Sequence, residues 1–131
     1  MSLNRPHKLT EAQEQKKVIE YVQVRYPHIY LKADISGVNV GAIKGRILKS
    51  LGNTKSHPDI TIFEPKNGYN GLLIELKKTG INLKNKLGKW AKPHYEAQAE
   101  TINILNKRGY YATFAIGFTD AKNIIDKYLA A

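Results

Sequence analysis

Two carboxylates and one lysine are the side chains of this sequence best suited to catalysis. Asp59, Glu75 and Lys77 lie in the segment HPDITIFEPKNGYNGLLIELKK, residues 57–78. Two carboxylates held a few ångströms apart repel each other, and a hard divalent cation such as Mg²⁺ or Mn²⁺ relieves that repulsion. A cation bound to Asp59 and Glu75 could polarise a phosphate ester and lower the pKa of a bound water. Lys77 could orient that water or neutralise charge on the phosphoryl oxygens.

The residues around this trio predict two strands joined by a turn. Residues 59–64 and 72–78 are apolar and β-branched runs, and the segment between them, PKNGYNG, is rich in Asn and Gly. Side chains alternate across a strand, so Glu75 and Lys77 share a face. The hairpin then brings Asp59 to the same end of the sheet. Because an unpaired buried charge is unfavourable, Glu75 and Lys77 need an explanation.

A simpler interpretation is a hairpin that carries an ion pair between residues i and i+2 and a turn aspartate. From average residue frequencies, Pro-Asp followed by acid-x-Lys arises in roughly one in twenty chains of this kind. The placement of the pattern on two consecutive strands favours the metal site over this alternative.

The same residues resemble a known nuclease motif. Pro58-Asp59 followed by Glu75-Leu76-Lys77 looks like the PD-(D/E)XK motif, and the wider pattern is similar to small phage and bacterial members of the VRR-NUC family. The segments that carry the likeness are TEAQEQKKVIEYV, SGVNVGAIKGRILKSLG, GLLIELKK and NKRGYYATFA, from about residue 10 to residue 118. The resemblance implies a restriction-endonuclease-like core and metal-dependent cleavage of DNA phosphodiesters, often in branched or structured DNA.

The resemblance also implies an acid on the first helix, for which two residues compete. At about 100° per residue, the apolar stripe of that helix is centred about 45° from Val18. Its members are Val18, Ile19 and Val22. Glu11 falls within this stripe and Glu14 at its margin, so Glu11 is predicted to be the inward acid and Glu14 is the second candidate. Alternatively, both acids simply favour the helix dipole.

Gln98 is predicted to lie on the inner face of a later helix. Its neighbours on that face are Tyr95, Ala99, Ile102 and Leu105. A core amide commonly satisfies itself on backbone groups. The resemblance instead implies that Gln98 positions water, the lysine or DNA in the active site.

The charge of the chain favours a polyanionic partner. Lys and Arg number 21 against 11 Asp and Glu, a formal charge of +10, and residues 76–94 contain no acid. Such an excess is typical of nucleic-acid binding, although a basic protein can also be merely soluble. Trp90 could stack on an unpaired base or pin its loop to the core. The candidate phosphate contacts are Lys44, Arg46, Lys55, Lys78, Lys84, Lys86, Lys89 and Lys92.

The composition predicts a soluble, cytoplasmic chain. The absence of cysteine excludes disulfides and thiolate metal sites. The N-terminal sequence has no apolar secretory segment, and the longest apolar stretch, residues 110–118, is too short to cross a bilayer. We expect one domain over residues 1–131, with residues 1–9 flexible and residues 79–93 forming a mobile basic loop.

The order of elements predicts an α/β fold with a mixed sheet flanked by helices. Strands are expected at residues 28–35, 59–64, 72–78 and 110–116. Helices are expected at residues 11–25, 42–51 and 94–107, and from a cap at Thr119 or Asp120 to Leu129.

These observations predict a Mg²⁺- or Mn²⁺-dependent DNA endonuclease. The main alternative is a non-catalytic nucleic-acid-binding module with the same fold and basic face. A structural subunit that binds an acidic protein is a third interpretation. Two cuts in a branched substrate would suit a homodimer, although no heptad or apolar patch in the sequence predicts one.

Overall fold

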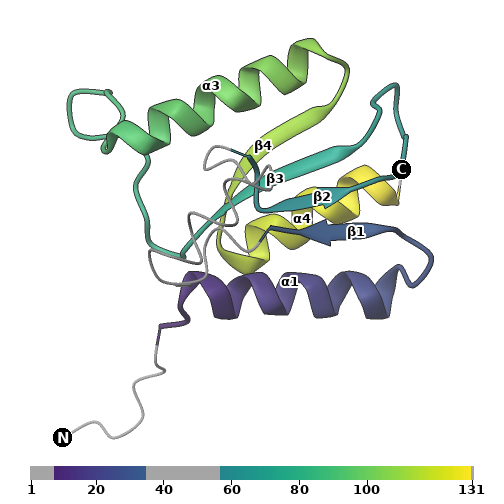
Figure 1. Cartoon of the computed structure of the whole chain (residues 1–131). Helices are drawn as coiled ribbons and strands as arrows, with labels where there is room; N and C mark the ends of the chain where they lie inside the picture. Colours follow the sequence, from purple (N-terminus) through teal and green to yellow (C-terminus); the bar gives the residue numbers. More distant parts are fainter. Residues whose placement is uncertain (1–7, 35–56, 131) are drawn as a thin grey trace, which may run out of the picture.

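A computed structural model of the chain describes residues 8–34 and 57–130, and Figure 1 shows the arrangement of its elements. Four strands form one mixed sheet in the order β1-β2-β3-β4. Strand β2 is antiparallel to β1 and β3, whereas β4 is parallel to β3. The strands are β1 (Leu31–Ala33), β2 (Ile60–Ile62), β3 (Leu72–Lys77) and β4 (Tyr111–Ile116). The predicted helix at residues 42–51 lies outside the described residues.

Helices cover both faces of this sheet, which confirms the predicted α/β class. They are α1 (Glu11–Arg25), α3 (Pro93–Lys107) and α4 (Gly117–Leu129). Helices α1 and α4 lie side by side against one face, and α3 lies over the other face, beside β4 (Figure 1). Among these described helices, none combines the length and apolar character required to span a membrane.

Helix α1 begins where the sequence predicts. The Thr10 hydroxyl accepts a hydrogen bond from the Gln13 amide at 3.1 Å, and the Gln13 side chain accepts one from the Thr10 amide at 2.9 Å. This capping box satisfies two amides that the helix itself leaves unpaired. The helix ends at Arg25, before Pro27, as predicted.

Alternation along β3 separates an apolar core from a polar face. Leu72, Ile74 and Leu76 are fully buried and pack with residues of α1 and α4, including Val18 and Ile125. Leu73, Glu75 and Lys77 alternate with them and are therefore directed to the opposite face, which α3 covers. Because all six residues of β3 are buried, its two charged side chains lie inside the protein.

Several predicted boundaries are wrong. Strand β2 comprises Ile60–Ile62 instead of the predicted 59–64. Strand β1 comprises three residues instead of the predicted 28–35, because residues 27–28 form a turn in which the Ile29 amide bonds to the Tyr26 carbonyl. Helix α4 begins at Gly117, before the predicted Thr119 or Asp120 cap. Gly117 has φ +85°, which favours glycine, and the Asp120 carboxylate accepts a hydrogen bond from the Ile116 amide at 2.9 Å.

The two outer strands of the sheet are protected differently. Strand β1 is short and carries the exposed Lys32. Strand β4 is longer and uncharged, but side chains bond to its alternate residues. The Asn106 amide group donates to the Ala112 carbonyl at 3.1 Å and accepts from the Ala112 amide at 2.8 Å. The Thr113 hydroxyl donates to the Phe114 carbonyl, so several backbone groups that no described strand pairs are nonetheless satisfied.

The predicted basic loop contains a small hairpin. Residues 79–92 lie outside helices and strands, as expected, yet the Ala91 amide bonds to the Leu83 carbonyl and the Asn85 amide to the Lys89 carbonyl, each at 2.8 Å. An isolated bridge pairs Lys84 with Trp90. We call residues 83–91 the basic hairpin. Pro93 is already the first residue of α3, where proline is favoured.

Candidate active site

The sheet register brings Asp59 and Glu75 together. Ile60 pairs with Ile74 across the antiparallel strands, so the preceding Asp59 falls opposite Glu75 on the same face. Both carboxylates are 3% exposed, and the Lys77 side chain two residues further along β3 is 5% exposed. The Asp59 carboxylate accepts a hydrogen bond from the Leu76 amide at 2.9 Å, which fixes its position against β3.

Glu75 is held by two neighbours that the sequence also indicates as site residues. Lys77 Nζ lies 3.5 Å from Glu75 Oε1, and Gln98 Nε2 donates to the same oxygen at 2.9 Å. Gln98 is buried and reaches Glu75 from α3. Lys77 Nζ also lies 4.8 Å from the centre of the Tyr95 ring, a cation–π contact that restrains the ammonium group.

Burial and mutual repulsion disfavour charge on the two acids. Burial raises the pKa of Glu75 to about 9, with repulsion from Asp59 adding to the shift and Lys77 opposing it. Burial raises the pKa of Asp59 to about 6, although the Leu76 amide opposes that shift. Without a cation, the folded protein therefore holds these carboxylates less readily in their charged forms.

The donor atoms fit a hard divalent cation. Glu75 Oε2 and Gln98 Oε1 are buried and have no hydrogen-bond partner among the described residues. Oxygen donors with two carboxylates are what Mg²⁺ prefers, since water and substrate phosphate complete its coordination. Within residues 8–34 and 57–130, no cluster of three or more His, Cys, Asp or Glu side chains forms a larger metal site. The oxygen donors of Asp59, Glu75 and Gln98 suit Mg²⁺ or Mn²⁺ more than a metal that needs several nitrogen ligands.

The two acids of α1 have different surroundings, and the predicted ranking of their burial is wrong. Glu14 is buried, whereas Glu11 is half-buried. Ile19, a member of the predicted inner stripe, is only half-buried, so the buried side of α1 is centred nearer to Val18 and includes Glu14. Glu11 nevertheless acts on the site electrostatically, because its negative charge adds to the rise in the pKa of Asp59. Burial raises the pKa of Glu11 itself, while Lys77 opposes the shift.

Glu14 joins three elements, a role that the sequence does not predict. Its carboxylate accepts hydrogen bonds from the Thr79 amide at 2.8 Å and from the Thr79 hydroxyl, just beyond β3. It also accepts one from the Phe118 amide in the first turn of α4, at 3.4 Å. These hydrogen bonds satisfy the negative charge of Glu14 at the end of β3 and tie α1 to β3 and α4.

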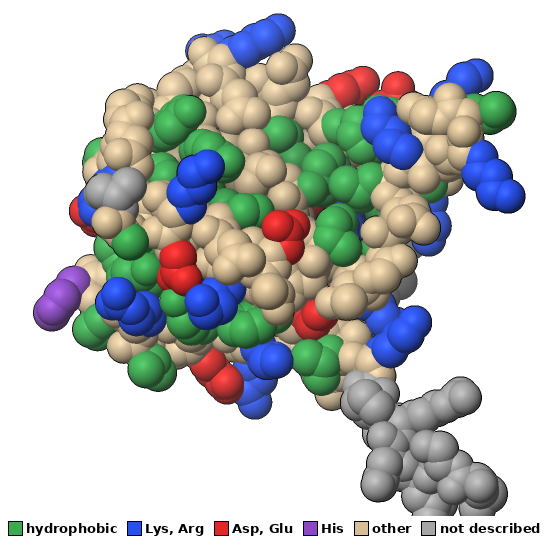
Figure 2. All heavy atoms as spheres, turned by 180° about the vertical axis from the view of Figure 1, so that it is seen from behind, with side chains coloured by type: hydrophobic (Ala, Val, Ile, Leu, Met, Phe, Trp, Pro, Cys, Tyr) green, Lys and Arg blue, Asp and Glu red, His purple; other side chains and the backbone are tan. Residues whose placement is uncertain are grey.

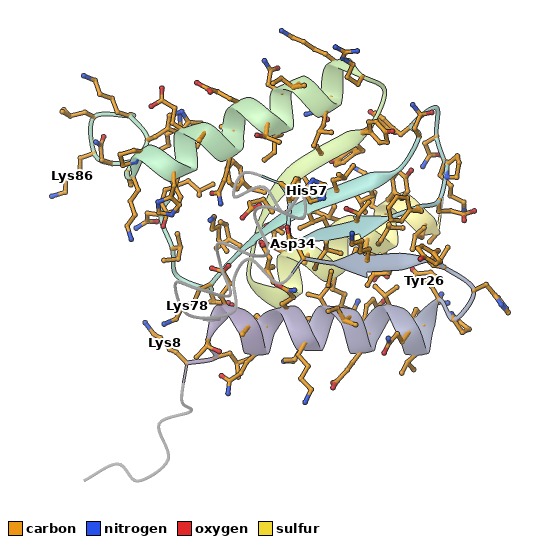
Figure 3. The ribbon with its side chains drawn as sticks, in the orientation of Figure 1. Lys8, Tyr26, Asp34, His57, Lys78 and Lys86 are labelled. Carbon is orange, nitrogen blue, oxygen red and sulfur yellow. The ribbon has the colours of Figure 1, made fainter. Side chains whose placement is uncertain are left out.

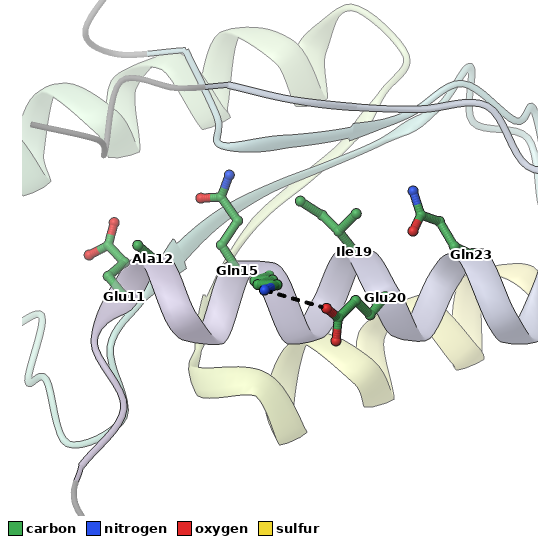
Figure 4. Close-up of a pocket in the computed structure, with 7 residues that line it drawn as sticks. Glu11, Ala12, Gln15, Ile19, Glu20 and Gln23 are labelled. Atoms are coloured by element: carbon green, nitrogen blue, oxygen red, sulfur yellow. Dashed lines mark ion pairs between the residues drawn. The ribbon is translucent and has the colours of Figure 1, made fainter. Parts of the chain in front are cut away.

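A groove of about 330 Å³ runs along α1 from Glu11 (Figure 4). Glu11, Gln15, Ile19 and Gln23 follow at intervals of four residues and line one side of the helix. The Gln15 amide donates to the Asp34 carbonyl at 3.2 Å, beyond the end of β1. The groove thus includes Glu11, the acid whose charge raises the pKa of Asp59.

The described basic candidates lie along one edge of the molecule. Figure 3 shows Lys86 on the projecting basic hairpin and Lys78 just after β3, with Lys8 near it. Lys84, Lys86, Lys89 and Lys92 are exposed, and Lys78 and Trp90 are half-buried. Lys44, Arg46 and Lys55 lie outside the described residues.

Comparisons with known proteins support the fold. No family model matches the chain, and no curated protein matches it. Among solved structures, a VRR_NUC domain protein matches with a TM-score of 0.67 and 26% sequence identity, covering 95% of this chain and 92% of that chain. The chain therefore has a VRR-NUC-like α/β fold, and the name of this neighbour suggests a nuclease-type domain.

Proposed function

We propose that this chain is a Mg²⁺- or Mn²⁺-dependent endonuclease of the PD-(D/E)XK type that hydrolyses DNA phosphodiester bonds, with branched or otherwise structured DNA as its substrate. The observation that carries the proposal is the buried carboxylate pair of Asp59 and Glu75 beside Lys77. Adjacent buried acids without full compensation destabilise a fold, so their presence indicates a functional role. The nuclease-type neighbour supports the same interpretation.

Each residue has a distinct role in this proposal. Asp59 and Glu75 hold the cation, which when bound polarises the scissile phosphate and lowers the pKa of the attacking water. Lys77 stabilises the charge that develops on the phosphoryl oxygens, and Gln98 keeps Glu75 in place through their hydrogen bond. Glu11 adds negative charge at the edge of the site. The exposed lysines grip phosphates without reading sequence.

A metal-dependent cleavage panel tests the proposal. The protein is incubated with intact, nicked, flapped and four-way DNA in Mg²⁺, Mn²⁺ or EDTA, beside the variants Glu75→Gln and Lys77→Met. We expect cleavage in Mg²⁺ or Mn²⁺, none in EDTA or with Glu75→Gln, and a rate reduced by about 10²–10³ with Lys77→Met. Glu96→Gln, which removes an exposed acid of α3, is the matched control and should cut normally.

The outcomes separate this function from its alternatives. Activity that survives in Glu75→Gln contradicts the assigned site. DNA binding without cleavage in any metal favours the non-catalytic binding module. Calorimetric titration of Mg²⁺ or Mn²⁺ in the presence of an oligonucleotide provides an independent measurement, and heat of binding should be absent in Glu75→Gln.

A further inference from the structure

We propose that Leu87, at the tip of the basic hairpin, is an apolar wedge that enters an interrupted base stack of the DNA substrate. This inference rests on the proposed nuclease function and concerns how the DNA is gripped. Leu87 is 81% exposed, although it is a large apolar side chain at the end of a charged segment. Its position there has no explanation in the packing of the protein itself.

The turn of the hairpin is organised to present this residue. The Asn85 side-chain oxygen accepts hydrogen bonds from the Leu87 amide at 2.9 Å and from the Lys89 amide at 3.1 Å. The Gly88 amide bonds to the Asn85 carbonyl at 3.0 Å, and Gly88 adopts a φ of +77°. Such a turn fixes the backbone of Leu87 before any partner binds, which reduces the entropy lost on binding.

The base of the hairpin stands beside the carboxylate pair. The Trp90 ring lies 6.0 Å from the Phe114 ring, and Phe114 pairs with Glu75 in the parallel register of β3 and β4. Lys84 Nζ lies 3.7 Å from the centre of the same Trp90 ring. Trp90 therefore pins the hairpin to the active-site face, and Leu87 is left as the exposed apolar residue of the projection.

Charge identifies the partner of this tip as a polyanion. Lys84, Lys86 and Lys89 surround Leu87 on the hairpin and are exposed. The sequence from residue 79 to residue 95 contains no acid. Seen from behind, this projection lies at the upper right of Figure 2, where basic side chains gather around a hydrophobic one. An apolar protein surface would not favour this ring of cations, whereas a phosphate backbone on either side of a base stack would.

A wedge favours DNA whose stacking is already broken. Insertion of an apolar side chain between base steps must first separate the stacked bases, and several DNA-bending proteins use leucine in this way. The energy required is smallest where pairing or stacking is interrupted. Leu87 would therefore favour a nick, flap or junction over an intact duplex and place the strand discontinuity next to Glu75.

A base-stacking probe tests the proposal. The full chain, with Ca²⁺ in place of Mg²⁺, is titrated into a flapped duplex that carries 2-aminopurine at the branch, and into an intact duplex with the same probe. We expect the protein to increase the fluorescence of the flapped probe as the base unstacks. Leu87→Ala should abolish this increase and weaken binding to the flapped duplex by roughly tenfold, with intact-duplex binding unchanged.

Two variants make the result specific. Val24→Ala removes another apolar side chain, 84% exposed on α1, and should behave as the unmodified protein. Lys86→Ala should weaken binding to both DNAs but retain the fluorescence increase at saturation. Because Leu87 is exposed, the melting temperature of Leu87→Ala should be unchanged, which excludes misfolding as the cause.

Other outcomes overturn the wedge. The wedge is wrong if the fluorescence increase persists in Leu87→Ala. It is also wrong if Leu87→Ala weakens binding to both DNAs equally, since Leu87 would then be a general contact. Loss of self-association in Leu87→Ala, with DNA binding intact, would assign the tip to a protein contact. Failure of the unmodified protein to bind or cut any DNA would instead contradict the proposed function itself, so the two failures are distinguishable.

Discussion

Glu75 is a residue whose charged form the metal-free fold disfavours. Burial raises its pKa to about 9, so its folded-state pKa exceeds the ordinary value of 4.5. In the absence of metal, stability should therefore decline as pH rises from about 4.5 towards 9, because the unfolded chain ionises first. Any cation that binds the ionised pair should reverse part of this loss.

The variant Glu75→Gln is predicted to be inactive yet more stable than the unmodified protein without metal. The neutral amide removes the repulsion from Asp59 and can still accept the Gln98 hydrogen bond. We expect a gain of about 1–2 kcal/mol, or roughly 3–8 °C in melting temperature, measured by calorimetry at pH 7.5 in EDTA. A lower melting temperature would show that the charge of Glu75 supports the fold.

Added Mg²⁺ provides the converse measurement. It should raise the melting temperature of the unmodified protein in proportion to the logarithm of its concentration and leave Glu75→Gln unchanged. Glu96→Gln should respond as the unmodified protein does, since Glu96 is an exposed acid on α3.

At the residue scale, the sequence predicts the candidate site residues better than the residues that surround them. Strand alternation and the long turn between β2 and β3 are enough to place Asp59, Glu75 and Lys77 on one face. The role of Glu14 is not predictable, because the angle of the inner stripe depends on whether Ile19 belongs to the core. The contact of Lys77 with Tyr95 requires the crossover that brings α3 over β3, which no local pattern specifies.

At the scale of elements, the junction of α1, β3 and α4 requires glycine at position 117, because a side chain there would not fit. A Cβ atom at Gly117 would lie 2.3 Å from Thr79 Oγ1 and 3.2 Å from Glu14 Oε1. Gly117→Ala should therefore strain the backbone and displace the Thr79–Glu14 contact, with a loss of about 2–3 kcal/mol in unfolding free energy.

A second glycine separates the effect of backbone strain from the effect of the steric clash. Gly80 has a similar φ of +90°, but a Cβ atom at this position would meet no other atom within 4 Å. Gly80→Ala should thus lose only the part of the unfolding free energy that comes from backbone strain, about 1 kcal/mol. Denaturant unfolding of both variants under the same conditions measures the difference. Equal losses in both variants would mean that the close approach at Gly117 contributes nothing.

Helices α1 and α4 are also joined by Asp126. Its carboxylate accepts hydrogen bonds from Tyr21 at 2.5 Å and Tyr26 at 2.7 Å, and from Lys122 at 2.9 Å. Burial alone would raise the pKa of Asp126, but hydrogen bonds from the two tyrosines and Lys122 outweigh it and lower the pKa to about 2. A lowered pKa stabilises the fold above the ordinary value of 3.8, and that stability is lost as pH falls towards 2.

Asp126→Asn should therefore destabilise the protein at neutral pH by no more than about 1 kcal/mol, because the group lies partly in solvent. The difference in melting temperature between the two proteins should shrink as pH falls from about 4 to 2. Thermal unfolding monitored by circular dichroism across that range measures it. A difference that stays constant would assign the effect to packing instead of charge.

The elements themselves are predictable where a local device sets them. Thr10 and Gln13 start α1, and the Asn- and Gly-rich turn joins β2 to β3. The start of α4 differs from its prediction because a glycine with positive φ replaces a side-chain cap there. The sequence does not predict the basic hairpin, because its turn depends on a hydrogen bond to the Asn85 side chain and its base on the contact between Trp90 and Phe114 of β4.

At the scale of the whole molecule, the sequence predicts charge and class but not shape. The formal +10 and the α/β order follow from residue types, and Lys78 and Lys86 lie on one edge of the molecule (Figure 3). The parallel pairing of β3 and β4 is not specified by the sequence alone, yet it places Phe114 and the hairpin beside the site. A homodimer and a cytoplasmic location stay predictions.

This edge has a measurable electrostatic consequence. The double variant Lys86→Ala and Lys89→Ala should reduce the slope of log affinity against log salt by about 2 for duplex DNA, because fewer counterions are released. Lys107→Ala with Lys127→Ala removes the same charge from the last turns of α3 and α4 and is the matched control. Equal slopes for the two double variants would mean that total charge, and not the hairpin, governs binding.

The side chains that close the margin of β4 have a consequence for concentrated solutions. With Asn106 bound to Ala112, Thr113 to Phe114 and Asp120 to Ile116, an incoming chain finds few free groups with which to extend the sheet. A basic protein that gathered in many copies on one polyanion would otherwise risk polymerising through its longest uncharged strand. Loss of the Asn106 side-chain amide should thus promote fibre growth at high protein concentration.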